Sequence, residues 1–293
     1  MPSPTETPEH QGDRLPAVLR LVGPASAFYV AFFLAPILIL FALSFWSMRG
    51  FNLAPGFTLL NYLQGMTSSL YRAVLLRTVL VGFITACLVV PAAYLYSYLM
   101  RFVFAHRAQL LLDLVLASMF SGYLVRIYAW RTILGKDGIL NSVLLEVHFI
   151  DKPLRFLIFS NWAVIITLVG LLIPLALLPI YSSMSNVSKD HLEVARDLGS
   201  SGFHLHRTIL IPMTLPGLRM AFAFAFLLSV GDFVVPALVG GTQGLMIGNV
   251  IADQFRGIGS NWPLGAALAV LVMAAVLAIW YAITRISRGV LER

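Results

Sequence analysis

Two long stretches of this chain carry no charged side chain, and they limit the folds that it can adopt. One runs for 23 residues between Arg77 and Arg101, and the other runs for 28 residues from Gly257 to Thr284. An α-helix needs about 20 mainly apolar residues to cross the hydrocarbon of a bilayer. These runs are continuous and do not alternate with polar residues, which argues against the strands of a membrane β-barrel. The sequence therefore predicts an all-α membrane protein.

The composition agrees with a chain that lies mostly in lipid. Charged residues make up 11% of it, whereas soluble domains carry about 25%. The net charge of +7 could suggest nucleic acid as a partner, but the basic residues sit at the ends of apolar runs. Snorkelling and membrane topology account for basic residues in such places. We therefore expect a lipid bilayer, and no nucleic acid, as a partner.

Six apolar spans follow one another along the chain. They are expected at about 21–46, 74–100, 109–127, 161–182, 217–239 and 263–284, between terminal tails at 1–20 and 285–293. The first run is longer than the core of a cleaved signal peptide, so we expect it to persist as a span. Six spans put both termini on one side. The short basic loop 101–107 and the arginines of the C-terminal tail favour the cytoplasm for that side.

The polar segment 183–216, between the fourth and fifth spans, has an ordered pattern. A first short helix is expected up to about residue 198, with Leu192 and Ala195 on one apolar stripe. Glycines then permit a tight turn, and a second, basic helix is expected at about 203–210. We expect Pro212 and Pro216 to break the chain before span five begins. Such an elbow either lies on the lipid headgroups or fits a groove of a partner protein.

The order of residues in this segment resembles a known signature. Glu193-x-Ala195-x-x-Leu198-Gly199, then Ile209-x-Ile211-Pro212, then Pro216-Gly217 is similar to the "EAA" loop of binding-protein-dependent ABC importer permeases. Val194 and His206 depart from the commoner residues of that loop. The resemblance implies an ATPase-coupling role for Glu193, Ala195, Leu198, Gly199, Gly202, Phe203, His206, Arg207 and Pro212.

The same resemblance implies a fold, an assembly and a location. The expected fold is the six-helix transmembrane domain of a type I ABC importer, with both termini in the cytoplasm. Its expected partners are a second permease subunit, two ATP-binding cassette subunits and an extracytoplasmic substrate-binding protein. The expected location is the bacterial inner membrane.

Two further stretches resemble one subgroup of these permeases. Residues 124–141 and 231–255 look like the external segment and the gate region of spermidine/putrescine permeases. The long interval between the first and second spans is similar to that of the first of the two paired permeases. This implies a polyamine as the transported solute. Permeases for iron, opines or phosphonates share these features, so another solute of the same transport class is an alternative. An ATP-independent channel or secondary carrier is a further alternative function.

Asp232 is the charged residue that the fifth predicted span contains after Arg219. A carboxylate at such depth costs a few kcal/mol and usually faces a cavity or a partner. It could form a structural ion pair with Arg126, or it could contact a cationic solute on the translocation path. Arg126, Phe233, Tyr128 and Trp130 are the other candidates for that path, and the aromatic ones are suited to it since aromatic faces attract ammonium groups. An aromatic belt at the membrane interface is the alternative for Tyr128 and Trp130.

The motifs of nucleotide hydrolysis and metal catalysis are absent from the sequence. The one Gly-Lys pair, Gly135–Lys136, is followed by Asp137, so no phosphate-binding loop is present. The six histidines are scattered and show no metal-ligand spacing. We therefore expect a non-catalytic subunit that binds no cofactor or metal, with ATP and magnesium held by partner ATPase subunits.

Overall fold

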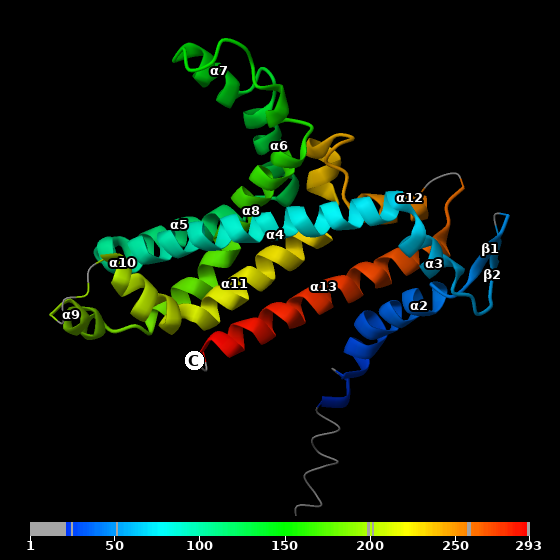
Figure 1. Ribbon diagram of the computed structural model, residues 1–293, viewed down its shortest axis with the longest axis horizontal. Coiled ribbons are helices and arrows are strands. Elements are labelled where there is room, and N and C mark those ends of the chain that lie inside the picture. Colours follow the sequence, from blue (N-terminus) through cyan, green and yellow to red (C-terminus); the bar gives the residue numbers. More distant parts are fainter. Residues whose placement is uncertain are drawn as a thin grey trace, which may run out of the picture.

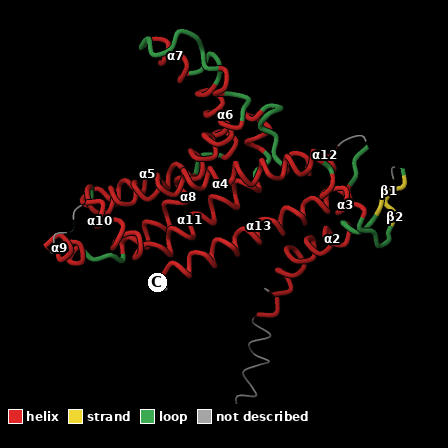
Figure 2. Tube along the Cα trace, viewed as in Figure 1, coloured by secondary structure: helices red, strands yellow, loops and turns green. Residues whose placement is uncertain are grey.

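The long helices of the protein lie roughly side by side, while one helical arm projects sideways from them (Figure 1). This computed structural model describes residues 22–24, 26–50, 52–197, 200, 202–256 and 259–291. The predicted tail 1–20 lies outside the described residues, and so do Leu198 and Gly199. Figure 2 shows that the described part is helical apart from one small hairpin and the connecting loops.

The elements follow in this order along the chain. The first half holds η1 (Val30–Leu34), α2 (Ala35–Leu43), β1 (Ser47–Arg49), β2 (Asn52–Ala54), α3 (Leu60–Thr67), α4 (Ser69–Tyr98), η2 (Leu99–Val103), η3 (Ala105–Arg107), α5 (Ala108–Met119), α6 (Tyr123–Leu134) and α7 (Ile139–Glu146). The second half holds η4 (Arg155–Leu157), α8 (Asn161–Ser185), α9 (Lys189–Asp197), α10 (Gly202–Leu205), η5 (His206–Leu210), α11 (Ile211–Gly231), η6 (Pro236–Gly240), α12 (Ile247–Arg256) and α13 (Trp262–Leu291).

Five of the described helical stretches are long and apolar enough to cross a membrane. They are Val22–Leu43, Ser69–Val103, Asn161–Ser185, Gly202–Gly231 and Trp262–Ile283. The third predicted span differs from a straight helix over 109–127, because Ala105–Met119 and Tyr123–Glu146 meet at a bend of 95°. The number of spans is six if this bent pair is taken as one broken span. Gly122 lies at the bend with an extended ψ of 140°, and the hydroxyls of Ser118 and Ser121 bond to nearby carbonyls there.

The fifth span is longer at its start than predicted. We expected Pro212 and Pro216 to break the chain before it, and this expectation is wrong, since one helical stretch runs from Gly202 to Gly231. The wide π-helical turn η5 directly precedes Pro212, and Pro216 lies inside α11. A π turn and nearby hydroxyls can satisfy the backbone groups that a proline frees. Here the amide of Ile211 donates to the carbonyl of His206, the wider bonding pattern of a π turn.

The core lies where α4, α8 and α11 pack against one another. Small residues on α4 and α11, including Ala86, Ala93, Ala221 and Ala225, are fully buried there. Helices in lipid associate mainly through close packing, which small side chains permit. Gly217 of α11 allows the closest approach, because a Cβ atom there would lie 2.8 Å from Ser183 Cβ on α8.

The opposite ends of the bundle carry different structures. The loop at 104–107, the α9–α10 segment and the C-terminal end of α13 lie toward one end (Figure 1). The β1–β2 hairpin, α3 and α12 lie at the other end, where α3 and α12 both contact α13. There Thr78 of α4 accepts a hydrogen bond at 2.8 Å from the amide of Ile247, which anchors the start of α12.

We expect Gly217→Ala to destabilise the protein, because its methyl group would overlap Ser183 and the carbonyl of Pro179 on α8. Overpacking of this kind costs about 1–3 kcal/mol. Thermal unfolding of the purified protein measures it. Gly231→Ala in the same helix is the matched control, since a Cβ there meets nothing within 4 Å. Equal melting temperatures for the two variants would contradict the close approach of α8 and α11.

Candidate functional site

Asp232 stands at the break that ends the fifth span. Helix α11 stops at Gly231, and Asp232 is extended with φ −76° and ψ 129°. One oxygen of its carboxylate, Oδ1, accepts the backbone amides of Val234 at 2.8 Å and Val235 at 3.1 Å. This is the bonding of a helix N-cap, in which an aspartate satisfies amides that lack a helical partner. The half-buried carboxylate thus stabilises the restart of the helix after the break.

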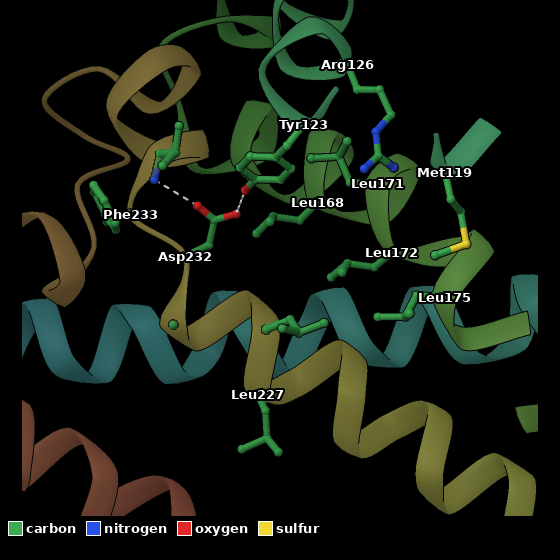
Figure 3. Close-up of a pocket in the computed structure, with 13 residues that line it drawn as sticks. Met119, Tyr123, Arg126, Leu168, Leu171, Leu172, Leu175, Leu227, Asp232 and Phe233 are labelled. Carbon is green, nitrogen blue, oxygen red and sulfur yellow. Dashed lines mark hydrogen bonds between the residues drawn. The ribbon is translucent and has the colours of Figure 1, made fainter. Parts of the chain in front are cut away.

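The second oxygen of the Asp232 carboxylate accepts a hydrogen bond from the hydroxyl of Tyr123 (Figure 3). Tyr123 is the first residue of α6, directly after the bend that divides the third span. A side chain at one helix break therefore binds a side chain at another. Hydrogen bonds to an ionised group are stronger than those between neutral groups. The bond holds α6 against the end of α11.

A cavity of about 460 Å³ opens beside this pair. Its wall is mainly leucine side chains from α8 and α11, and Tyr123, Arg126 and Asp232 supply the polar groups. Within the described part of the chain, Arg126 forms no hydrogen bond through its buried Nε atom. The ion pair between Arg126 and Asp232, one of the two sequence-based alternatives, is not formed among these residues.

Phe233 lies on the other side of the break and points away from Tyr123 (Figure 3). The guanidinium carbon of Arg256 sits 5.5 Å from the centre of its ring. A second cavity of about 490 Å³ lies on this side, between α11, α12 and α13. The two cavities share Leu227, Gly231 and Phe233 in their walls. Phe233 therefore stands between them.

The other two aromatic candidates lie elsewhere. Trp130 of α6 packs over Gly170 of α8, where no Cβ atom would fit beneath its ring. It lines a separate cavity with Trp162. Tyr128 is 51% exposed on α6 and does not line the cavity beside Asp232. The structure thus brings Asp232, Phe233 and Arg126 together and leaves Tyr128 and Trp130 apart from them.

Tyr123 is the site residue that sequence reasoning missed. It was hidden inside the third predicted span, where an aromatic residue carries no signal of its own. The neighbouring Ser121–Gly122 pair was the available hint, because serine and glycine together often mark a kink in a helix. A kink exposes the next side chain to a new set of neighbours.

The predicted coupling segment forms a surface at the other end of the fifth span. Leu192 of α9 is buried with Val187, Leu205 and Leu210 against Tyr98 and Phe102. Glu193, Phe203 and Arg207 are exposed beside this cluster, and Phe203 is 81% exposed. We call these three residues, with α9 and α10, the α9–α10 surface. Leu198, Gly199 and the side chain of Ala195 lie outside the described residues.

One member of the predicted coupling set, His206, faces the helix bundle. The Nδ1 atom of His206 lies 2.7 Å from the hydroxyl of Tyr94, and its ring packs 4.7 Å from that of Tyr98, both on α4. Pro212 begins α11. Arg101 on η2 donates to the carbonyls of Ser185 and Val187 at 3.3 Å each. These contacts join the α9–α10 surface to the ends of α4 and α8.

Comparison with known proteins identifies the class. Residues 61–293 match the family described as binding-protein-dependent transport system inner membrane component, and the chain belongs to this family. It is therefore a multi-pass inner-membrane protein and the permease subunit of an ABC importer. It is 33% identical over 256 residues to the spermidine/putrescine transport system permease protein PotB of Haemophilus influenzae, covering 86% of this chain and 88% of that protein. It is 38% identical over 238 residues to PotB of Escherichia coli K12, covering 78% and 84%.

Solved structures show the same fold. A bacterial ABC transporter involved in the import of the acidic polysaccharide alginate superposes with a TM-score of 0.77 at 13% identity, covering 94% of this chain and 96% of that one. The methionine ABC transporter MetNI in an inward-facing conformation gives a TM-score of 0.55 at 17% identity, covering 76% and 99%. At these identities the likeness concerns the fold alone.

We expect Tyr123→Phe to destabilise the protein by removing the hydrogen bond that the Asp232 carboxylate accepts from another helix. Such a bond to a charged group contributes about 1.5–3 kcal/mol. Thermal unfolding measures the change. Tyr128→Phe on the same helix is the control, because no hydrogen bond of the Tyr128 hydroxyl is present among the described residues. A loss of stability in both variants alike would assign the effect to α6 in general.

Proposed function

We propose that this permease forms the path for a polyamine such as spermidine or putrescine and that Asp232 contacts an ammonium group of the solute. The observation that carries the proposal is the placement of the Asp232 carboxylate beside the leucine-walled cavity, without an ion-pair partner among the described residues. A carboxylate in apolar surroundings attracts a cation more strongly than one in water does. The names of the two PotB relatives support a polyamine as the solute.

The remaining polar groups of the cavity suit transient binding. The hydroxyl of Tyr123 and two backbone amides already satisfy part of the carboxylate, so an ammonium group would share it with them. Arg126 adds a positive charge to the wall of the same cavity. A transport path must bind its solute firmly enough to admit it and weakly enough to release it. A partly satisfied carboxylate near a second cation meets that requirement.

The α9–α10 surface is the contact for a separate ATPase subunit in this proposal. It presents Phe203 with charged neighbours of both signs, and partner proteins commonly anchor on an exposed aromatic residue of that kind. This chain has no phosphate-binding loop, so nucleotide and magnesium bind to the partner. We place the α9–α10 surface and both termini in the cytoplasm. The full assembly has a second permease subunit, two ATPase subunits and an extracytoplasmic binding protein.

The fifth span connects the two functional regions. One helical stretch of 30 residues runs from Gly202 in the α9–α10 surface to Gly231 beside Asp232. At 1.5 Å per residue such a helix is about 45 Å long. Leu205 and Leu210 at its start are buried against α4. When ATP binding displaces this surface, the movement is therefore transmitted along the helix to the carboxylate. The same movement opens the cavity to one side of the membrane and then to the other.

We expect Asp232→Asn to lower polyamine uptake by about tenfold or more, because loss of a charged partner in a desolvated site costs several kcal/mol. Uptake of radiolabelled putrescine into proteoliposomes that hold the complete transporter measures this. Asp113→Asn is the control, since that exposed carboxylate on α5 accepts a hydrogen bond from Gln109 of the same helix. Unchanged uptake by assembled Asp232→Asn transporter would overturn the role of this carboxylate.

The same assay separates the alternatives for the transported solute and the energy source. If the wild-type transporter does not take up polyamines but takes up another solute that its binding protein delivers, it is a permease of the same class with a different substrate. Uptake that persists without any ATPase subunit would indicate a channel or a secondary carrier.

We expect Phe203→Ala to weaken binding of the ATPase subunit by about fivefold or more, because exposed aromatic anchors dominate such contacts. Co-purification of the ATPase subunit with the permease pair measures it. Phe149→Ala is the matched control, because Phe149 is also highly exposed, at 78%, but follows α7 on the lateral arm. Full recovery of the ATPase subunit with Phe203→Ala would contradict this contact.

A further inference from the structure

The ring of Phe233 is already covered by a cation of the protein itself. The guanidinium of Arg256, in the last turn of α12, lies 5.5 Å from the ring centre, within the range of a cation–π contact. Arg256 is exposed, and among the described residues it has no ion-pair partner and no hydrogen bond. The aromatic ring is therefore the one group in the described part of the chain that holds this positive charge in place.

The surrounding structure holds the ring and the arginine in this arrangement. The side-chain amide of Asn249 donates to the carbonyl of Phe233 at 2.7 Å, and its oxygen accepts the amide of Met246 at 3.1 Å. The amide of Ile247 is anchored on Thr78 of α4. The start of α12 is thus attached both to the break at Asp232–Phe233 and to the bundle. Two turns further along α12, Arg256 reaches back to the ring.

From this geometry we infer that Phe233 is a second cation-binding residue of the translocation path and that Arg256 occupies its ring until a solute ammonium group displaces it. The inference rests on the proposed function of Asp232. Phe233 lies between the two cavities, and Leu227 and Gly231 also line both of them. A solute that passes from one cavity to the other meets the ring next to the carboxylate.

Two adjacent residues then recognise two positive charges. Consecutive Cα atoms lie about 3.8 Å apart, while Asp232 and Phe233 direct their side chains to opposite sides of the break (Figure 3). A flexible diamine can place one ammonium group on the carboxylate and the other on the ring. A monoamine can engage only one of them. Joining two weak contacts in one molecule raises the affinity above that of either contact. The pair therefore favours solutes with at least two amines.

The sign of one substitution separates this role from a purely structural one. If Arg256 competes with the solute, Arg256→Gln frees the ring and strengthens binding. If the contact only fastens α12 to the break, the same substitution loosens the site and weakens binding, as Phe233→Leu would. Arg256→Lys keeps the positive charge and should keep the competition.

Equilibrium binding of radiolabelled putrescine to the purified complex of both permeases and the ATPase subunits tests this. We expect Phe233→Leu to weaken binding by about two- to fivefold and Arg256→Gln to strengthen it by a similar factor, as one cation–π contact is modest. Phe233→Trp should retain binding, and Arg256→Gln should have no effect in the Phe233→Leu background. Butylamine, which has one amine, should bind equally well to the wild-type protein and to Phe233→Leu, as measured by its competition with putrescine.

Each outcome decides between the two roles. Weaker binding in Arg256→Gln, or equal effects of that substitution with and without the phenylalanine, overturns the inference. Loss of binding in Asp232→Asn together with unchanged binding in Phe233→Leu and Arg256→Gln overturns it while the proposed function stands. Absence of putrescine binding and uptake by the wild-type transporter overturns both.

Discussion

The need to satisfy backbone hydrogen bonds inside the bilayer constrains this structure more than any other requirement. A break in a spanning helix exposes amides and carbonyls that lipid cannot bond, so breaks occur only where other groups replace the missing partners. At the end of α11, the Asp232 carboxylate accepts two amides of the following turn. The same carboxylate then binds Tyr123 at the break of the third span. One acidic side chain therefore satisfies backbone amides at one helix break, joins it to a side chain at another, and leaves a charge beside a cavity.

The same constraint explains why the fifth span is continuous where prolines suggested an interruption. The π-helical turn His206–Leu210 lies just before Pro212, and the helix passes on to Gly231. The α9–α10 surface and Asp232 therefore lie at the two ends of a single element. In the function that we propose, this element couples a movement at the α9–α10 surface to a polar group within the membrane.

Much of the architecture was predictable from residue patterns. The long uncharged runs indicated the spanning helices, and the signature from Glu193 to Gly217 indicated the family, which residues 61–293 match. The isolated carboxylate of Asp232 was visible because a charge in an apolar run is rare and costly. The bend in the third span was not predicted, since short apolar runs on both sides of Ser121–Gly122 read as one span. Trp130 was grouped with Asp232 because aromatic faces attract cations, although it packs on Gly170 of another helix.

The sequence by itself determined which segments enter the membrane, which family the chain belongs to and where its unusual charge lies, because hydropathy and local motifs are properties of neighbouring residues. Only the tertiary structure decided the partners of that charge. Tyr123 and Asp232 are 109 positions apart. Arg256 meets Phe233 because α12 is anchored on Thr78, 169 positions from Ile247. Helices that are apolar on most faces can pack in several ways in lipid, and the close contacts at Gly217 and Gly170 select among them.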